Sequence, residues 1–202
     1  MTGMEHVDEE VQDEDWEGRD LGAAAYSGTT FIDVDLTDAL TQAATFTDCT
    51  FRRVRFNTSI HTGSAFANCV FMQCSFFGAT FTGCKMIGSS FERCTFTSLT
   101  VADGDWSFVE LSGADLRRTR FTGVRMREAG LTSVRAEEAT LRNVDLSGAS
   151  LHGANLSRAD LRGSDLSTID PAVVDLRGAT IGWRQAVQLA EAAGLEVDLD
   201  DE

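Results

Sequence analysis

A bulky apolar residue recurs at every fifth position along most of this 202-residue chain. The recurrence runs from Phe31 to Ile181, and of its 31 positions only those of Thr41, His61 and Pro171 depart from the apolar pattern, while Ala136 is apolar but small. A small residue, often Ala, Cys, Ser or Val, stands two places before each bulky one. An α-helix repeats every 3.6 residues and a strand every two, so neither element by itself accounts for a period of five.

A chain that turns a corner every five residues does account for this period. Each side of such a coil directs the bulky and small residues inward, and its other three residues face solvent. Four sides close a square coil of 20 residues, and successive coils stack at about 4.8 Å, where their backbone groups form hydrogen bonds. The pattern therefore predicts an all-β fold, a quadrilateral β-helix with a filled core.

The limits of the pattern divide the chain into four segments. We expect a disordered acidic tail over residues 1–15, the β-helix over 16–181, a helical segment over 182–195 and a second acidic tail over 196–202. The open end of a solenoid exposes a cross-section of its core, and terminal repeats need a cap. The helical segment is the predicted cap.

Apolar residues at helical spacing support this C-terminal helix. Trp183, Ala186, Val187 and Ala190 fall at i, i+3, i+4 and i+7, and Gly194 is a natural residue to end the helix. A cap that leaves apolar side chains exposed would also be the contact between two subunits. The predicted dimer-contact residues are Trp183, Val187, Ala190 and Leu195.

The net charge of −15 is concentrated at the two ends of the chain. Residues 1–20 contain nine acids and one arginine, residues 191–202 contain six acids and no base, and the segment between them is nearly neutral. Two interpretations are open. The ends are either solvated extensions or electrostatic contacts for a basic partner surface.

The cysteines and histidines do not form the pattern of a catalytic or metal site. All five cysteines occupy the small inward position, as expected for small buried hydrophobes, and none has the paired spacing of a zinc site. His61 lies 20 residues after Thr41, so both belong to the same side of adjacent coils. They are either a tolerated polar defect or a bulge that shapes a binding surface.

The remaining chemistry points to a function of the outer surface. The chain has no nucleotide-binding, hydrolase or metalloprotease motif, and a filled solenoid is expected to have no large pocket. We therefore expect a protein that is not an enzyme, with no catalytic, cofactor-binding or metal site. The acidic N-terminus does not have the pattern of a signal peptide, and no apolar run reaches membrane-spanning length, so the expected location is cytoplasmic.

The repeat motif resembles that of a known family. The sequence Ala-[Asp/Asn]-Leu appears in full at residues 114–116, 154–156 and 159–161, and this resembles the pentapeptide repeat family over roughly residues 16–181. The resemblance implies a right-handed quadrilateral β-helix. Within the family, the stretches 61–69 and 85–91 are similar to the mycobacterial fluoroquinolone resistance proteins.

The resemblance also implies a function and partners. It implies a rod-shaped homodimer, joined through the C-terminal helix, that imitates duplex DNA and binds DNA gyrase. Such a protein modulates or inhibits gyrase and confers fluoroquinolone resistance, without binding nucleic acid, a membrane or a small molecule. The alternative is a generic interaction scaffold or self-resistance factor with a different partner.

One acidic cluster is the predicted gyrase-facing surface. Its residues follow one another around a single coil, and five arginines follow them in the sequence. The cluster is either a docking surface or a solvated girdle of salt bridges. Its members are Asp103, Asp105, Glu110 and Asp115.

Overall fold

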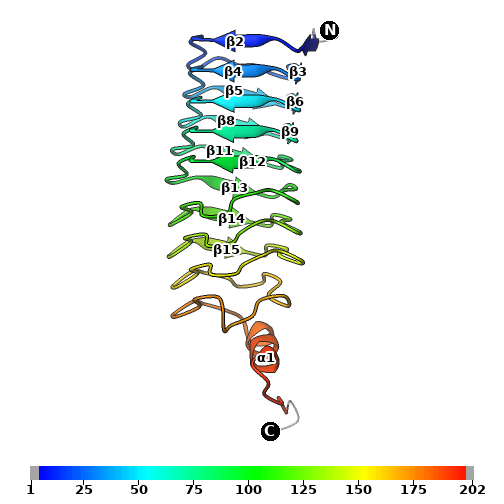
Figure 1. Cartoon of the computed structure of the whole chain (residues 1–202), viewed down its shortest axis with the longest axis vertical. Helices are drawn as coiled ribbons and strands as arrows, with labels where there is room; N and C mark the ends of the chain where they lie inside the picture. The colour runs from blue at the N-terminus through cyan, green and yellow to red at the C-terminus, as the bar shows by residue number, and fades with distance from the viewer. Residues whose placement is uncertain (1–4, 199–202) are drawn as a thin grey trace.

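The computed structural model describes residues 5–198 as a rod of stacked coils with one helix at its C-terminal end (Figure 1). Each strand has three residues and lies in the middle of a coil side. The strands are β1 (Glu5–Val7), β2 (Glu10–Gln12), β3 (Ala25–Ser27), β4 (Thr30–Ile32), β5 (Leu40–Gln42), β6 (Thr45–Thr47), β7 (Thr50–Arg52), β8 (Ile60–Thr62), β9 (Ala65–Ala67), β10 (Val70–Met72), β11 (Thr80–Thr82), β12 (Ser90–Glu92), β13 (Thr100–Ala102), β14 (Arg120–Thr122) and β15 (Thr140–Arg142), and the helix is α1 (Trp183–Ala192).

The strands form three parallel sheets along the rod. Their orders are β1-β3-β6-β9, β12-β10-β7-β4-β2 and β15-β14-β13-β11-β8-β5. Isolated bridges such as Asp15 to Asp35 and Asp35 to Arg55 form the ladder of the fourth side. Every pair in these sheets is offset by 20 residues, as in Phe31 opposite Phe51. The predicted all-β, right-handed quadrilateral β-helix with a short C-terminal helix is therefore confirmed.

Aromatic rings fill the core of the N-terminal half. Phe31 stacks on Phe51, Phe51 on Phe71 and Phe71 on Phe91, with ring centroids 4.8, 4.8 and 4.7 Å apart. These distances match the spacing of hydrogen-bonded strands, because each ring stands above the ring of the next coil. The described cysteines lie between these rings as free thiols, all buried except the half-buried Cys94.

Side chains at the corners explain the Asp and Asn of the motif. The Asp115 carboxylate accepts a hydrogen bond from the backbone N–H of Arg117 at 3.3 Å, and Asn155 accepts one from Ser157 at 3.0 Å. These are Asx turns, in which a short polar side chain satisfies the N–H two residues later. Many of the regularly spaced acids therefore stabilise corners of the coil.

The predicted disordered N-terminal tail is wrong for the residues that the structure describes. Strand β1 pairs with β3, and β2 pairs with β4, so residues 5–15 belong to the first coil. His6 stacks on Tyr26 with 4.7 Å between ring centroids, and Val11 packs against the core. Both residues continue the five-residue register, so their side chains point inward while the acids point outward. Residues 1–4 of this tail lie outside the described residues.

A buried polar cluster replaces two core hydrophobes near the N-terminal end. The His61 ring contacts the Thr41 hydroxyl through Nδ1 at 2.8 Å and the Ser59 hydroxyl through Nε2 at 2.9 Å. Ser64 completes the network with a 2.8 Å contact to Thr41. The imidazole is fully buried, and desolvation lowers its pKa to about 3, so His61 is neutral in the folded protein. Of the two interpretations of this pair, the tolerated polar defect agrees with these contacts, because the polar groups are paired and the strand register is unbroken.

The C-terminal helix closes the end of the solenoid through a polar side chain. Gln185 is buried, and its amide group donates to the carbonyl oxygens of Leu161 at 2.7 Å and Ser164 at 2.8 Å. Its side-chain oxygen accepts from the N–H of Gly182 at 2.7 Å, which satisfies one of the free donors at the start of the helix. These bonds attach α1 to the backbone groups that the final coil leaves open.

Most of the apolar stripe of α1 faces away from the coils. Trp183 is 68% exposed and Ala186 is also exposed, whereas Gln185 and Leu189 are the residues that turn toward the coils. The backbone carbonyls of the last coil need donors, which an apolar stripe does not supply, so a glutamine faces them. The helix ends at Ala192 and Gly194 follows with a φ of +84°, as its C-terminal position predicts. The part of the acidic C-terminal tail from residue 199 onward lies outside the described residues.

Candidate functional surfaces

The first two coils present a dense array of carboxylates. Residues 6–38 contain eleven acidic side chains against one arginine, a net charge of −10 with His6 neutral. Residues 39–182 contain 14 acids and 15 bases, a net charge of +1. The β-helix therefore has a strongly anionic N-terminal end and a nearly neutral body.

Arginines of the third coil neutralise only part of this array. The Arg53 guanidinium binds Asp33 through Nε at 2.7 Å and Nη2 at 2.5 Å, and Arg55 pairs with Asp35. The hydrogen bond from Arg55 holds the pKa of Asp35 down at about 2. In the described chain, no arginine or lysine forms an ion pair with an acid of residues 8–20. The carboxylates of the first coil are therefore held on an ordered frame with their charge uncompensated.

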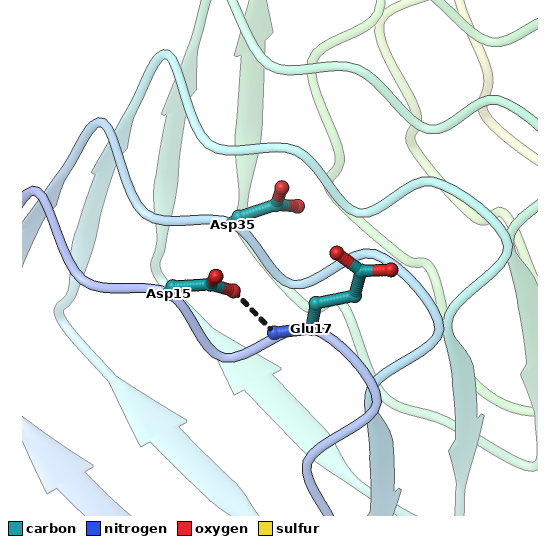
Figure 2. A group of neighbouring side chains, drawn as sticks. All are labelled: Asp15, Glu17 and Asp35. Carbon is teal, nitrogen blue, oxygen red and sulfur yellow. Dashed lines mark hydrogen bonds between the residues drawn. The ribbon is translucent and has the colours of Figure 1, made fainter.

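Three of these carboxylates converge on one side of the rod (Figure 2). Oxygens of Asp15, Glu17 and Asp35 lie within 4.8 Å of one another. Asp15 accepts a 3.0 Å hydrogen bond from the Glu17 backbone N–H, and Asp35 is bound to Arg55. Two of the three carboxylates already have partners, since Asp15 stabilises a turn and Asp35 is paired with Arg55. The group is therefore part of the anionic surface of the rod.

The four acids predicted to form one gyrase-facing surface are not brought together. Asp105, Glu110 and Asp115 belong to three different sides of their coil, because each lies in a different ladder of bridges. Asp105 pairs with Arg125 at 2.6 Å, and Asp115 binds both Arg117 at 2.6 Å and Arg135 at 2.9 Å.

Asp103 lies at a corner of the same coil. It has a φ of +58°, and its carboxylate lies beside Gly123 of the next coil. The surroundings of the set fit the alternative interpretation, a solvated girdle of ion pairs. Sequence periodicity placed these acids on the outside but did not show that arginines of neighbouring turns and coils bind them.

The predicted dimer-contact residues on α1 and just after it differ in exposure. Trp183 is 68% exposed and Leu195 is 63% exposed, whereas Val187 and Ala190 are half-buried. Helix α1 projects from the end of the rod (Figure 1). The described chain contains no helix with the length and apolar character needed to cross a bilayer.

Comparisons with known proteins agree with this architecture. Residues 74–151 match the model of the pentapeptide repeat region. A trypsin-treated form of QnrB1, a plasmid-mediated fluoroquinolone resistance protein, superposes with a TM-score of 0.63 and 21% identity, covering 97% of this chain and 98% of that chain. Full-length QnrB1 superposes with a TM-score of 0.50 and 20% identity, covering 95% and 100%. No curated protein sequence matches the chain.

At these identities the solved structures establish the fold alone. The family match and the fold nevertheless agree with each other, because the matched residues lie inside the stacked coils and keep their 20-residue register. Residues 74–151 are therefore a pentapeptide repeat region, and the described chain as a whole has the pentapeptide repeat β-helix fold.

Proposed function

We propose that this protein binds DNA gyrase as a partial DNA mimic, modulates or inhibits the enzyme and thereby confers fluoroquinolone resistance. The observation that carries the proposal is the carboxylate array of residues 6–38, whose acids at residues 8–20 form no ion pair with an arginine or lysine in the described chain, on an ordered pair of coils. The likeness of the fold to QnrB1 and the resemblance of residues 61–69 and 85–91 to the mycobacterial protein MfpA support the choice of partner.

The charge of the rod, compared with that of duplex DNA of the same length, supports mimicry of DNA by one end of the rod rather than by the whole rod. Two coils span about 10 Å of the rod axis, a length over which duplex DNA carries about six phosphate charges. The net charge of −10 over residues 6–38 meets that density, whereas the +1 of residues 39–182 does not. We therefore infer a mimicking surface at the N-terminal end rather than along the whole rod.

The exposed apolar residues of α1 support a homodimer as part of this proposal. Joining two copies through Trp183 and Leu195 would cover the largest exposed side chains of the C-terminal end. It would also place the two acidic ends at opposite tips of a longer rod, because α1 and the first coil lie at opposite ends of each chain (Figure 1).

The test neutralises the first coil without unfolding it. A triple variant, Asp8→Asn, Asp13→Asn and Asp15→Asn, keeps short polar side chains that tolerate left-handed corners and Asx turns. The matched control carries the same change at Asp145, Asp160 and Asp175, which are ion-paired in the body. We expect the wild type and the control to alter gyrase supercoiling at micromolar concentration or below, and the N-terminal variant to lose at least tenfold in potency.

Two results would contradict the proposal. If the wild-type protein neither changes supercoiling nor binds either gyrase subunit, gyrase is the wrong partner. If the control loses as much potency as the N-terminal variant, the acidic coils do not form the mimicking surface. For the dimer, the double variant Trp183→Glu and Leu195→Glu should be a monomer by light scattering, and a dimer of wild-type stability would exclude this contact.

The nearly neutral body favours a second candidate, a protein-interaction scaffold with a different partner. A net charge of +1 over residues 39–182 leaves most of the rod without a DNA-like potential. Affinity capture from the source cell separates the two candidates, because a dominant partner other than gyrase, still bound by the N-terminal variant, would favour the scaffold.

A further inference from the structure

One side of the rod contains a break in the ladder of backbone hydrogen bonds. On each regular side of the solenoid, three backbone hydrogen bonds join one coil to the next. Two N–H groups of the first coil donate to carbonyl oxygens of the second, and one N–H of the second donates to a carbonyl oxygen of the first. At the junction between residues 76 and 96 all three bonds are present, from Phe76 to Thr95, from Gly78 to Thr97 and from Thr95 to Cys74, at 2.8 to 3.0 Å.

At the following junction of the same side, the equivalent bonds are absent from the described chain. The N–H groups of Phe96, Ser98 and Asp115 have no backbone acceptor across the junction, and no isolated bridge links Thr95 to Asp115. The bonds resume one coil later, where the Leu116 N–H donates to Arg135 at 2.7 Å. The other three sides keep their bridges at this level, although the Arg93 N–H on the adjoining side also lacks its regular bond to Ser112 in the described chain. The coils therefore separate mainly on one side.

A cleft of about 510 Å³ lies at this break. Cys94, Thr95, Phe96 and Thr97 line it from one coil, and Asp115, Arg117 and Arg118 line it from the next. The cleft extends over Glu137, Glu138 and Arg158 of the following coils, so it is an open groove on the outer face of the rod. Cys94 and Ala114 are half-buried, although most residues at this inward position in the central coils are buried.

Trp106 is an oversized inward residue in the chain between the two open segments. It lies on the opposite side of the coil, midway in the chain between Phe96 and Leu116, and its side chain is the largest of those fully buried. The neighbouring positions above and below it carry the slimmer Met86 and Met126. The Trp106 ring lies 6.1 Å from Phe91 and 5.9 Å from Phe81, so its bulk is inserted between core layers of adjacent coils.

The backbone before Trp106 is also adapted to it. Gly104 occupies the small inward position with a φ of +91°, and a Cβ there would lie 2.1 Å from the Cys84 carbonyl oxygen. The indole Nε1 of Trp106 is buried without a hydrogen-bond partner in the described structure. The oversized side chain and the left-handed glycine before it therefore lie in the stretch of chain that joins the two open segments.

We propose that the cleft is an insertion site for an extended segment of a partner protein. Within the described chain, the first edge of the cleft, here called the first lip, has the unpaired N–H groups of Phe96 and Ser98 and the unpaired carbonyl of Cys94. The second lip likewise has the unpaired carbonyls of Asp115 and Arg117 and the unpaired N–H of Asp115. A strand running parallel to the chain would form with each lip the bonds that the two lips lack with one another.

The chemistry of the lips specifies the segment. Its central side chain would point inward beside Cys94 and Phe96, so a small or aliphatic residue fits there, and its neighbours would face the polar rim. On that rim Arg118 pairs with Glu138 at 2.9 Å and Arg117 with Asp115 at 2.6 Å, so the charges are largely balanced. The Oε2 atom of Glu137, another lining residue, is buried without a partner in the described structure and is available to an incoming N–H donor.

The test uses a synthetic peptide and the half-buried thiol of the cleft. The probe is an N-acetylated, C-amidated peptide with the sequence of residues 153–159, which carries Leu at the inward position. At about ten times its Kd, the peptide should slow alkylation of Cys94 about tenfold by mass action. It should also slow hydrogen exchange at the amides of Phe96 and Ser98. The control peptide has proline in place of the central leucine, which removes the central N–H donor.

The matched protein variant is Trp106→Met, which copies the residue above and below. We expect it to close the junction, slow Cys94 alkylation in the free protein and abolish the effect of the peptide. No change in alkylation or exchange at millimolar peptide would overturn the proposal, as would equal protection by the proline peptide. So would a Trp106→Met protein that binds the peptide as well as the wild type does. The site is separate from the acidic coils, so the gyrase result does not decide this one.

Discussion

The two halves of the rod hold their coils together differently. From residue 26 to 96 aromatic rings stack at the strand spacing, with Phe46 to Phe66 at 4.7 Å and Phe56 to Phe76 at 4.9 Å. From residue 111 onward the core is mostly Leu, Val and Ala, and the outer surface carries most of the ion pairs, such as Arg127 with Asp145 at 2.6 Å. One backbone path therefore accommodates two kinds of packing, provided that the inward volume stays nearly constant.

The junction between these halves shows what happens when that volume changes. Trp106 stands where the aromatic core gives way to the aliphatic one, and the ladder opens on the side opposite to it. Packed interiors resist added volume, and strain of this kind is transmitted to the backbone. The difference indicates that coil spacing in this fold depends on the size of each inward side chain.

The largest expected effect is the loss of stability when a core side chain is truncated, and one core residue from each half allows the comparison. Phe71→Ala removes a ring that stacks on Phe51 and Phe91, and should lower the free energy of unfolding by about 4–5 kcal/mol. Leu151→Ala, in the aliphatic half, should lower it by about 3 kcal/mol. Urea unfolding measures both, and a smaller loss for Phe71→Ala would contradict the stronger packing of the aromatic half.

The next effect tests the polar layer inside the aromatic half. Burial lowers the His61 pKa from 6.5 to about 3, so the unfolded chain binds an extra proton as pH falls below 6.5. The stability present above pH 6.5 should therefore be lost progressively toward pH 3, at about 1.4 kcal/mol per pH unit.

The range from pH 6.5 to 5 lies above the titration of ion-paired carboxylates such as Asp35 and Asp160, whose pKa values are held at about 2. We expect a loss of about 2 kcal/mol over this range in the wild-type protein. The variant His61→Phe, which copies Phe81 one coil later, should flatten the profile. A profile with the same slope in the variant would show that His61 is not the titrating group.

The smallest effect concerns the ion pairs of the aliphatic half. Arg118→Ala removes contacts with Glu138, but both side chains are largely solvated, so the cost should be about 0.5 kcal/mol or less. Added salt should reduce that cost further. A loss above about 2 kcal/mol would show that the girdle, rather than the core, holds these coils together.

The five-residue period was enough to predict the coil, its four sides and its buried residues. It worked because each inward residue is specified by local spacing, and every coil repeats the environment of the last one. It failed for residues 5–15 because their acidity masked the inward register of His6 and Val11. It carried no information about which face of the helix contacts the coils, since the need of backbone carbonyls for the Gln185 donor does not appear in an apolar stripe.

The candidate surfaces were less predictable than the fold. The sequence located the acidic ends, but the ordered first coil and the pairing of Asp105 with Arg125 depend on contacts across a 20-residue separation. The open junction left no interruption in the period, because its residues keep their register while their hydrogen bonds are lost. Its signal in the sequence is one oversized inward residue, Trp106, preceded by Gly104.

The sequence by itself determined the repeat, the course of the backbone and the charge of each segment, because these depend on spacing and composition. Only the tertiary structure decided which acids remain unpaired, which face of α1 closes the rod and where two coils separate. These features depend on the volume and hydrogen-bonding needs of neighbours one coil away, which are close in space and distant in the chain.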